Sequence, residues 1–181
     1  LHGKRVVKVA VGGLHTIALT ADGALWSWGC NDDLALGRTG VENEPHPVSF
    51  MDGSAGSVRV VDVVCGDCHS AALDSEGNVY VWGTYKGKDG YLGFGSGTMK
   101  QPIPFKMVSA VPEGSRKADP VVRIACGTHH TAAVRASGAL YTWGCGEQGQ
   151  LGRPVTAIML RGGRHKTLGL AVAEVKVVGK E

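Results

Sequence analysis

The chain has 181 residues, of which 43% are hydrophobic and 19% charged, a composition typical of a globular protein rather than a disordered one. It contains no run of about 18 apolar residues, which argues against a membrane span, and its net charge of +3 gives no bulk attraction to nucleic acid. Its 28 glycines are about twice the usual share of roughly 7% and predict many tight turns. The five cysteines are interpreted as reduced thiols of an intracellular protein, because they lack the density of a disulfide scaffold.

Three segments of the chain repeat one another without gaps over their cores. They read VVKVAVGGLHTIALTADGALWSWG, VVDVVCGDCHSAALDSEGNVYVWG and VVRIACGTHHTAAVRASGALYTWG. The chain is therefore predicted to be one array of units. Repeat one spans residues 6–59, repeat two 60–120 and repeat three 121–181, the end of which is either incomplete or a long basic loop.

Each repeat predicts the same succession of strands. A β-branched run predicts a buried strand, and a glycine-containing turn leads from it to a second strand that begins at a histidine. The next turn ends in glycine, which tolerates the positive φ that tight hairpins need, and a third, aromatic-rich strand ends at a Trp-Gly pair. The recurring residues are the anchor glycines Gly12, Gly66 and Gly127, the histidines His15, His69 and His130, and the turn glycines Gly23, Gly77 and Gly138.

The repeats indicate an all-β chain, because no segment keeps a helical period of 3.6 residues. One strand meander cannot bury both of its faces, so neighbouring meanders must stack. Radial stacking of four-stranded antiparallel blades gives a β-propeller, of which this chain supplies about three blades. The anchor glycines Gly12, Gly66 and Gly127 lie 54 and 61 residues apart. These spacings exceed the roughly 40–45 residues of WD repeats.

The G-x-x-H-[TS]-x-A-[LV] strand, the turn ending in glycine, the Trp-Gly pair and a closing Leu-Gly resemble repeats of the regulator of chromosome condensation family. Some stretches are more similar than a generic repeat and resemble the chromatin-bound exchange factors for the small GTPase Ran. These stretches are WSWGCNDDLALGR, YTWGCGEQGQLGR and the following RGGR. The resemblance covers nearly the whole chain and implies a fragment of a seven-bladed propeller. It also implies guanine-nucleotide exchange without covalent chemistry or a cofactor, in the nucleus, for the regulation of nuclear transport and mitosis. Whether this chain exchanges nucleotide by itself stays open.

The sequence around Cys65, Cys68 and His69 spells C-x-x-C-H, the attachment pattern of a c-type haem. Each half of that pattern also has a source in the repeat, since Cys65 matches a core position and His69 is the repeat histidine. No second cysteine pair completes four zinc ligands, so neither haem nor metal is expected. The repeat histidines are predicted to bridge strand backbone near the turn.

Positions where one repeat departs from the others are the candidates for function. The first such position directly follows the anchor glycine. It holds Gly13, Asp67 and Thr128. Asp67 either accepts N–H bonds within its own turn or faces a partner at the rim of the propeller. The resemblance implies an acidic residue here that faces the GTPase and supports nucleotide release, which makes Asp67 the predicted exchange residue. The family has a second acidic residue where this chain has His129, which implies altered or pH-dependent docking.

The loop between the Trp-Gly pair and the Leu-Gly pair is longer in repeat two. The two glycines that bound this loop are 8 residues apart in repeats one and three (29 and 37, 144 and 152) and 10 apart in repeat two (83 and 93). The longer loop is either an ordinary surface insertion or a protruding β-hairpin. The resemblance implies a β-wedge that inserts against the GTPase near its nucleotide. The residues assigned to this wedge are Tyr85, Lys86, Gly87, Lys88, Asp89, Gly90, Tyr91 and Leu92.

Basic residues follow the closing Leu-Gly pair of repeat three, among them Arg161 and Arg164. They form either a solvated loop or a contact to a carboxylate cluster, for which arginine forks are suited. The resemblance implies that both arginines bind the acidic patch of the nucleosome's histones, and it assigns contacts with DNA to a basic tail outside this chain. The alternative function is a non-catalytic repeat scaffold for protein–protein interaction. Three blades would leave strand edges and blade faces unpaired, so self-association or marginal stability of the isolated chain is expected.

Overall fold

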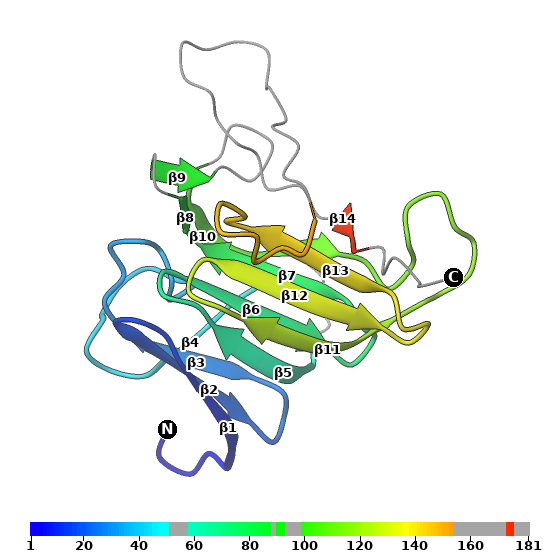
Figure 1. The fold of residues 1–181 in the computed structure, drawn as a ribbon. Coiled ribbons are helices and arrows are strands. Elements are labelled where there is room, and N and C mark those ends of the chain that lie inside the picture. The colour runs from blue at the N-terminus through cyan, green and yellow to red at the C-terminus, as the bar shows by residue number, and fades with distance from the viewer. Residues whose placement is uncertain (51–57, 88–89, 93–98, 154–172, 176–181) are drawn as a thin grey trace, which may run out of the picture.

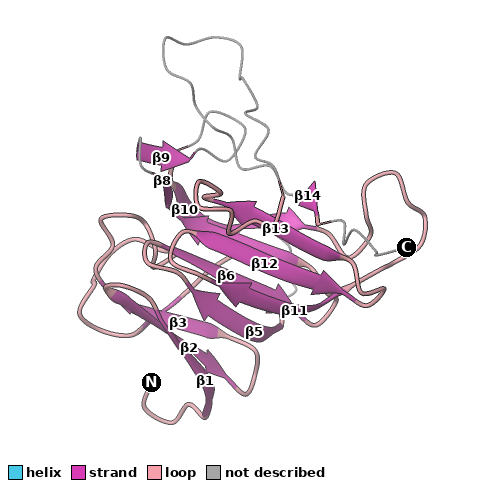
Figure 2. Ribbon diagram, viewed as in Figure 1, coloured by secondary structure: helices cyan, strands magenta, loops and turns pink. Residues whose placement is uncertain are grey.

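β-Branched and aromatic residues form strands at the positions that the repeats predict. The computed structural model describes residues 1–50, 58–87, 90–92, 99–153 and 173–175, and these contain fourteen strands and no helix (Figure 1, Figure 2). The described part of the chain accordingly offers no helix that could cross a lipid bilayer. The strands form three four-stranded antiparallel sheets and a separate two-stranded hairpin.

Each four-stranded sheet is built from the strands of one repeat and is one blade of a propeller, which confirms the predicted fold class. Blade one has the order β1 (Val6–Val11), β2 (His15–Thr20), β3 (Leu25–Gly29) and β4 (His46–Pro47). Blade two has the order β5 (Val60–Cys65), β6 (His69–Asp74), β7 (Val79–Gly83) and β10 (Gln101–Val108). Blade three has the order β11 (Val121–Cys126), β12 (His130–Arg135), β13 (Leu140–Gly144) and β14 (Ala173–Glu174). The hairpin consists of β8 (Tyr85–Gly87) and β9 (Gly90–Leu92), between β7 and β10.

Two apolar clusters hold the three blades together, one at each interface. Between blades one and two the cluster includes Ile17, Leu19, Leu25, Val63 and Trp82. Between blades two and three it includes Leu73, Val79, Val81, Ile124 and Trp143. At each interface, the facing sides of two blades therefore become buried only because the blades pack on each other, as a stacked repeat requires.

Two of the three repeat histidines, His15 and His69, form hydrogen bonds between blades, not to strand backbone as the sequence suggested. His15 Nε2 lies 2.8 Å from Ser70 Oγ, and His69 Nε2 lies 3.0 Å from Thr131 Oγ1, in each case the hydroxyl that follows the histidine of the next repeat. The rings lie over the anchor glycines, where a Cβ at Gly66 would approach His69 Cε1 to 2.0 Å. Burial lowers the pKa of His15 to about 4 and that of His69 to about 3, so both imidazoles are neutral.

Backbone hydrogen bonds tie the blades together at both ends of their inner strands. At one rim the Gly13 amide donates to the Asp67 carbonyl at 3.2 Å, and the Asp67 amide donates to the Thr128 carbonyl at 2.9 Å. At the opposite end the carbonyls of Gly23 and Gly77 each accept, at 3.0 Å, the amide of the first inner-strand residue of the next repeat. Gly23 and Gly77 have φ values of 87° and 89°, which confirms the predicted left-handed turn glycines.

The face of blade one that carries Val9 is exposed, whereas the matching faces of blades two and three are covered. Val9 is 52% exposed, whereas the matching Val63 and Ile124 are 0% and 8% exposed. A preceding blade packs on β5 and on β11, whereas the matching position on β1 stays exposed. The resulting apolar surface agrees with the expectation of self-association.

We predict that acid destabilises the chain through its interblade histidines. An unfolded histidine has a pKa near 6.5, and that of folded His69 is about 3. Between these values the unfolded state binds a proton that the folded state does not, so the free energy of unfolding falls as the pH falls. Each such histidine contributes up to about 1.4 kcal/mol per pH unit. Urea unfolding between about pH 7 and pH 4 measures the slope.

The variant His69→Gln tests the source of that slope, because a glutamine amide can bond Thr131 without titrating. We expect a smaller pH dependence in His69→Gln and an unchanged one in the control His2→Gln, since His2 is exposed. A slope that is the same in all three proteins contradicts the prediction.

We predict that the isolated chain associates through the open face of blade one. Sedimentation velocity should show concentration-dependent association that Val9→Lys weakens, because a charge there opposes apolar contact. Val61→Lys is the matched control: Val61 is 49% exposed, but its position is exposed in all three blades. A wild-type chain that stays monomeric at every concentration and melts cooperatively would rule out this association.

Candidate functional site

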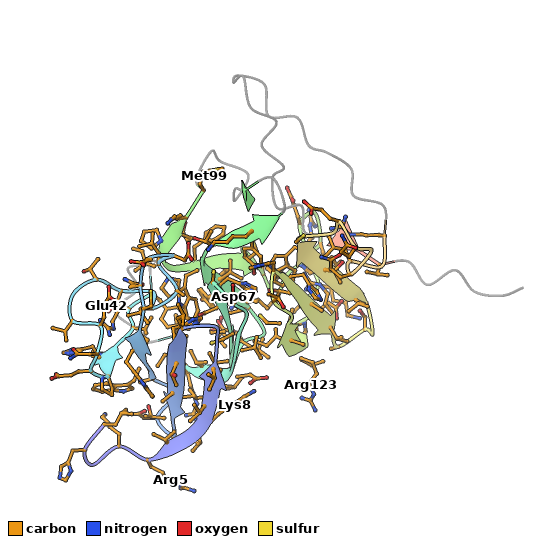
Figure 3. The ribbon with its side chains drawn as sticks, turned by 60° about the vertical axis from the view of Figure 1, so that its left-hand side comes forward. Arg5, Lys8, Glu42, Asp67, Met99 and Arg123 are labelled. Atoms are coloured by element: carbon orange, nitrogen blue, oxygen red, sulfur yellow. The ribbon has the colours of Figure 1, made fainter. Side chains whose placement is uncertain are left out.

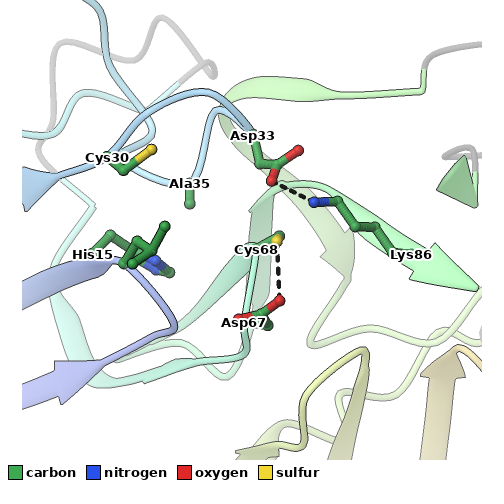
Figure 4. Close-up of a pocket in the computed structure, with 8 residues that line it drawn as sticks. His15, Cys30, Asp33, Ala35, Asp67, Cys68 and Lys86 are labelled. Carbon is green, nitrogen blue, oxygen red and sulfur yellow. Dashed lines mark hydrogen bonds and ion pairs between the residues drawn. The ribbon is translucent and has the colours of Figure 1, made fainter. Parts of the chain in front are cut away.

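A pocket of about 180 Å³ lies between blades one and two (Figure 4). The turn between β1 and β2, the loop after β3, the turn between β5 and β6 and strand β8 supply its walls. Its lining residues are Leu14, His15, Cys30, Asp33, Ala35, Asp67, Cys68 and Lys86. The pocket thus brings together Asp67 and the hairpin residue Lys86, which the sequence singled out for two unrelated reasons.

Asp67 presents a largely solvent-facing carboxylate at this rim, at the opposite end of the inner strands from Arg5 (Figure 3). Its side chain is 43% exposed, and its Oδ2 accepts the Cys68 thiol at 3.3 Å. Among the described residues no backbone N–H donates to this carboxylate, so the interpretation as a turn-capping aspartate is not supported. A Cβ at Gly13 would lie 2.0 Å from Asp67 Oδ1. The glycine in blade one therefore makes room for the acid in blade two.

His129 lies next to Asp67 on the same rim. Its Nε2 is 4.0 Å from Asp67 Oδ2, and its side chain is 28% exposed. This contact is an ion pair only when the imidazole is protonated. A second acidic residue at this position would repel the Asp67 carboxylate, whereas the histidine can neutralise it.

The longer loop of repeat two forms the predicted β-hairpin. Strands β8 and β9 pair antiparallel, with Lys86 opposite Tyr91 and Gly87 opposite Gly90. They form a two-stranded sheet of their own, separate from the ladder of blade two. The backbone of β9, residues 90–92, is described, and Lys88 and Asp89 lie outside the described residues.

Tyr85 was expected on the exposed wedge, but its side chain is fully buried between blades two and three. Its hydroxyl lies 2.8 Å from Thr131 Oγ1 and accepts Trp143 Nε1–H at 2.9 Å. Its ring stacks on His69 with centroids 4.0 Å apart. Burial raises the pKa of the phenol well above its ordinary value. Tyr85 is therefore an anchor for the hairpin, and its side chain is not available to a partner.

Comparison of the blades explains this placement. In blade two, Trp82 Nε1 donates to the Ala35 carbonyl of the preceding loop at 2.8 Å. In blade three, Trp143 donates instead to the hydroxyl of Tyr85. The inserted tyrosine thus replaces a loop carbonyl as the acceptor for the next blade's indole. The signal available in the sequence was an aromatic residue directly after the Gly83-Thr84 pair.

Asp33 joins the site although the sequence did not single it out. Its Oδ2 accepts Lys86 Nζ at 2.6 Å, and its Oδ1 lies 3.6 Å from Lys100 Nζ. Burial alone would raise the pKa of Asp33, but its contacts with Lys86, Cys68 and Lys100 outweigh burial and hold the pKa below its ordinary value. The carboxylate is therefore ionised at neutral pH, and it links blade one to the base of the hairpin.

The structure also describes the cysteines of the C-x-x-C-H pattern. The described residues contain no group of three or more His, Cys, Asp or Glu side chains that could hold a metal ion. Burial raises the pKa of both Cys65 and Cys68 to about 12, so neither thiol is a ready nucleophile or ligand. Arg161 and Arg164, the predicted chromatin contacts, lie outside the described residues.

Comparisons with known proteins agree on one family. A family model described as RCC1-like domain matches residues 1–179. The chain is 39% identical over 164 residues to Regulator of chromosome condensation of Homo sapiens, covering 88% of this chain and 36% of that protein. It is 34% identical over 180 residues to Guanine nucleotide exchange factor SRM1 of Saccharomyces cerevisiae, covering 83% and 36%.

A solved structure shows the same arrangement of blades. It is the crystal structure of Prp20p from Saccharomyces cerevisiae, described together with its binding to Gsp1p and histones. It superposes with a TM-score of 0.74 and 36% sequence identity, over 92% of this chain and 37% of that one. The chain thus spans a little over a third of the length of these relatives. By its repeats, its blades and these matches, it belongs to the regulator of chromosome condensation family.

Proposed function

We propose that the protein promotes guanine-nucleotide exchange on a Ran-type small GTPase in the nucleus, coupled to chromatin binding. The observation that carries the proposal is the pocket shared by Asp67 and Lys86. Asp67 is the residue at which the turn of repeat two differs from the turns of the other repeats. Lys86 lies in the loop that is longer in repeat two than in the other repeats. Their convergence on one rim forms a single surface suited to one protein partner. The relative SRM1, named as a guanine nucleotide exchange factor, supports the same activity.

The mechanism needs no bond made or broken in the nucleotide. A partner that binds the nucleotide-free GTPase more tightly than the loaded form must lower nucleotide affinity by the same factor. P-loop GTPases hold their phosphates with a lysine and backbone amides. The exposed carboxylate of Asp67 stabilises the empty form by pairing with a cationic group that otherwise binds phosphate. Leu14, which is 75% exposed on the same rim, adds apolar contact area.

A second candidate is a repeat scaffold that binds proteins without exchanging nucleotide. The observation in its favour is His129, which stands 4.0 Å from Asp67 where the family resemblance implies an acid. A protonated His129 would neutralise the rim carboxylate and weaken its pairing with a cation. Nucleotide release by the GTPase separates the two functions, because a scaffold binds without accelerating it.

We predict that Asp67→Asn slows nucleotide exchange more than it weakens docking. Loss of one charge-assisted contact formed mainly with the empty GTPase should lower the maximal rate by about tenfold. Stopped-flow release of a fluorescent nucleotide from Ran, with the full-length protein at increasing concentrations, gives the maximal rate and the half-saturating concentration separately.

Glu76→Gln serves as the control, because Glu76 lies in the turn at the opposite end of β6 and loses the same charge. An unchanged maximal rate in Asp67→Asn would remove Asp67 from the exchange reaction. Wild-type protein that binds the GTPase without accelerating release would favour the scaffold.

We further predict that Arg161 and Arg164 contribute to chromatin binding. The crystal structure of Prp20p is described with histone binding, and bidentate arginines match carboxylate clusters. The double variant Arg161→Ala, Arg164→Ala in the full-length protein should weaken nucleosome binding by on the order of tenfold. Electrophoretic mobility shift of nucleosomes measures the change.

Arg116→Ala is the matched control, since Arg116 is an exposed arginine elsewhere on the chain. Nucleosomes with a neutralised acidic patch should erase the difference between wild type and the double variant. Equal binding of the double variant and wild type to ordinary nucleosomes would contradict a role of these two arginines in chromatin binding.

A further inference from the structure

Among the described residues, the β8–β9 hairpin is not part of the strand ladder of any blade. It forms a two-stranded sheet of its own, and an isolated two-stranded hairpin is marginally stable at best in water. Contacts at its base must therefore set its position. Tyr85 supplies one such contact, toward blade three, through Trp143 and Thr131.

Asp33 supplies the opposing contact, from the loop after β3 in blade one. Lys86, on the strand that enters the hairpin, donates to Asp33 Oδ2 at 2.6 Å (Figure 4). Lys100, just before β10, lies 3.6 Å from Asp33 Oδ1. One carboxylate thus holds both the segment that enters the hairpin and the segment that follows it.

Backbone carbonyls of the same loop complete the grip. Thr84 Oγ1 donates to the Asp33 carbonyl at 2.8 Å, and Lys100 Nζ donates to the Asp32 carbonyl at 2.8 Å. All four contacts run between the loop after β3 in blade one and either β8 itself or the flanking residues Thr84 and Lys100. We define Asp33 with Lys86 and Lys100 as the hairpin clamp.

The clamp is shielded enough for its charges to matter. The side chains of Asp33 and Lys86 are 20% and 33% exposed, so their pairing is screened less than that of a surface pair. The ionised Asp33 beside it also raises the pKa of Lys86 above its ordinary value. Removing the charge of Asp33 would take from both lysines their ion pair with blade one, which favours displacement of the hairpin base.

The clamp also connects the hairpin to Asp67. Cys68 donates its thiol to Asp67 Oδ2 at 3.3 Å, and Asp33, Cys68 and Lys86 all line the pocket that Asp67 enters. A shift of β8 would therefore change the shape of that pocket and the distance between the two parts of the proposed docking surface.

We propose that Asp33 is a positioning residue, which holds the β8–β9 hairpin at the angle and distance from Asp67 that nucleotide exchange requires. The first half of this inference concerns the structure of the chain alone. The second half rests on the proposed exchange function. Asp33 acts through Lys86 and Lys100 and needs no contact with the GTPase.

Asp33→Asn tests the proposal, with Asp32→Asn as the matched control. Asp32 is the adjacent residue with the same charge, its side chain is exposed, and it meets Lys100 through its backbone carbonyl. Hydrogen–deuterium exchange of the β8 amides should be about two- to fivefold faster in Asp33→Asn and unchanged in Asp32→Asn. Asp33→Glu, which keeps the charge, should restore most of the protection.

Stopped-flow exchange on Ran with the full-length variants provides the functional readout. Misplacement of the hairpin by Asp33→Asn should lower the maximal rate by about tenfold, with partial rescue by Asp33→Glu and no effect of Asp32→Asn. Unchanged protection of the β8 amides in Asp33→Asn overturns the clamp whatever the exchange assay gives. Faster amide exchange with an unchanged maximal rate overturns the positioning role. If wild type accelerates no release, the proposed function fails, while the amide data still decide the clamp.

Discussion

The hydrogen bonds that join His15 and His69 to a hydroxyl of the next blade are the contacts on which the other features depend. The imidazole crosses the interface over an anchor glycine, where a Cβ at Gly12 would come within 2.1 Å of His15 Cε1. The glycine and the histidine of one repeat, together with the serine or threonine after the histidine of the next repeat, thus form one unit spread over two repeats. Because burial keeps the ring neutral, it bridges the blades without the desolvation cost of a charge.

This constraint explains how the two residues between the glycine and the histidine can differ from repeat to repeat. The amide and carbonyl of the Asp67 slot are used between blades, so the side chain can change while the backbone bonds remain. A large side chain still needs space, which Gly13 provides in the preceding blade. The acidic side chain of Asp67 thus requires a glycine at position 13 of the preceding repeat, and neither residue can be explained from its own repeat alone.

The sequence predicts what lies within a repeat and misses much of what lies between repeats. Strand order, turn glycines and the hairpin follow from local patterns such as the left-handed Gly77. The partner of His69 could not be predicted, because Thr131 belongs to another repeat. Asp33 was missed for the same reason, since Lys86 lies 53 residues away. Tyr85 was misplaced because an insertion predicts a surface loop, whereas the indole of Trp143 needs an acceptor in the core.

The position of the hairpin follows from that need. An indole N–H buried without a partner would cost on the order of 1–3 kcal/mol, so an insertion that displaced the loop carbonyl had to bring its own acceptor. Tyr85 does so, and it fixes the hairpin against blade three at the same time. Asp33 fixes the hairpin against blade one. The element proposed to reach the GTPase is therefore held from both sides of blade two, and its orientation depends on both interfaces that the histidines maintain.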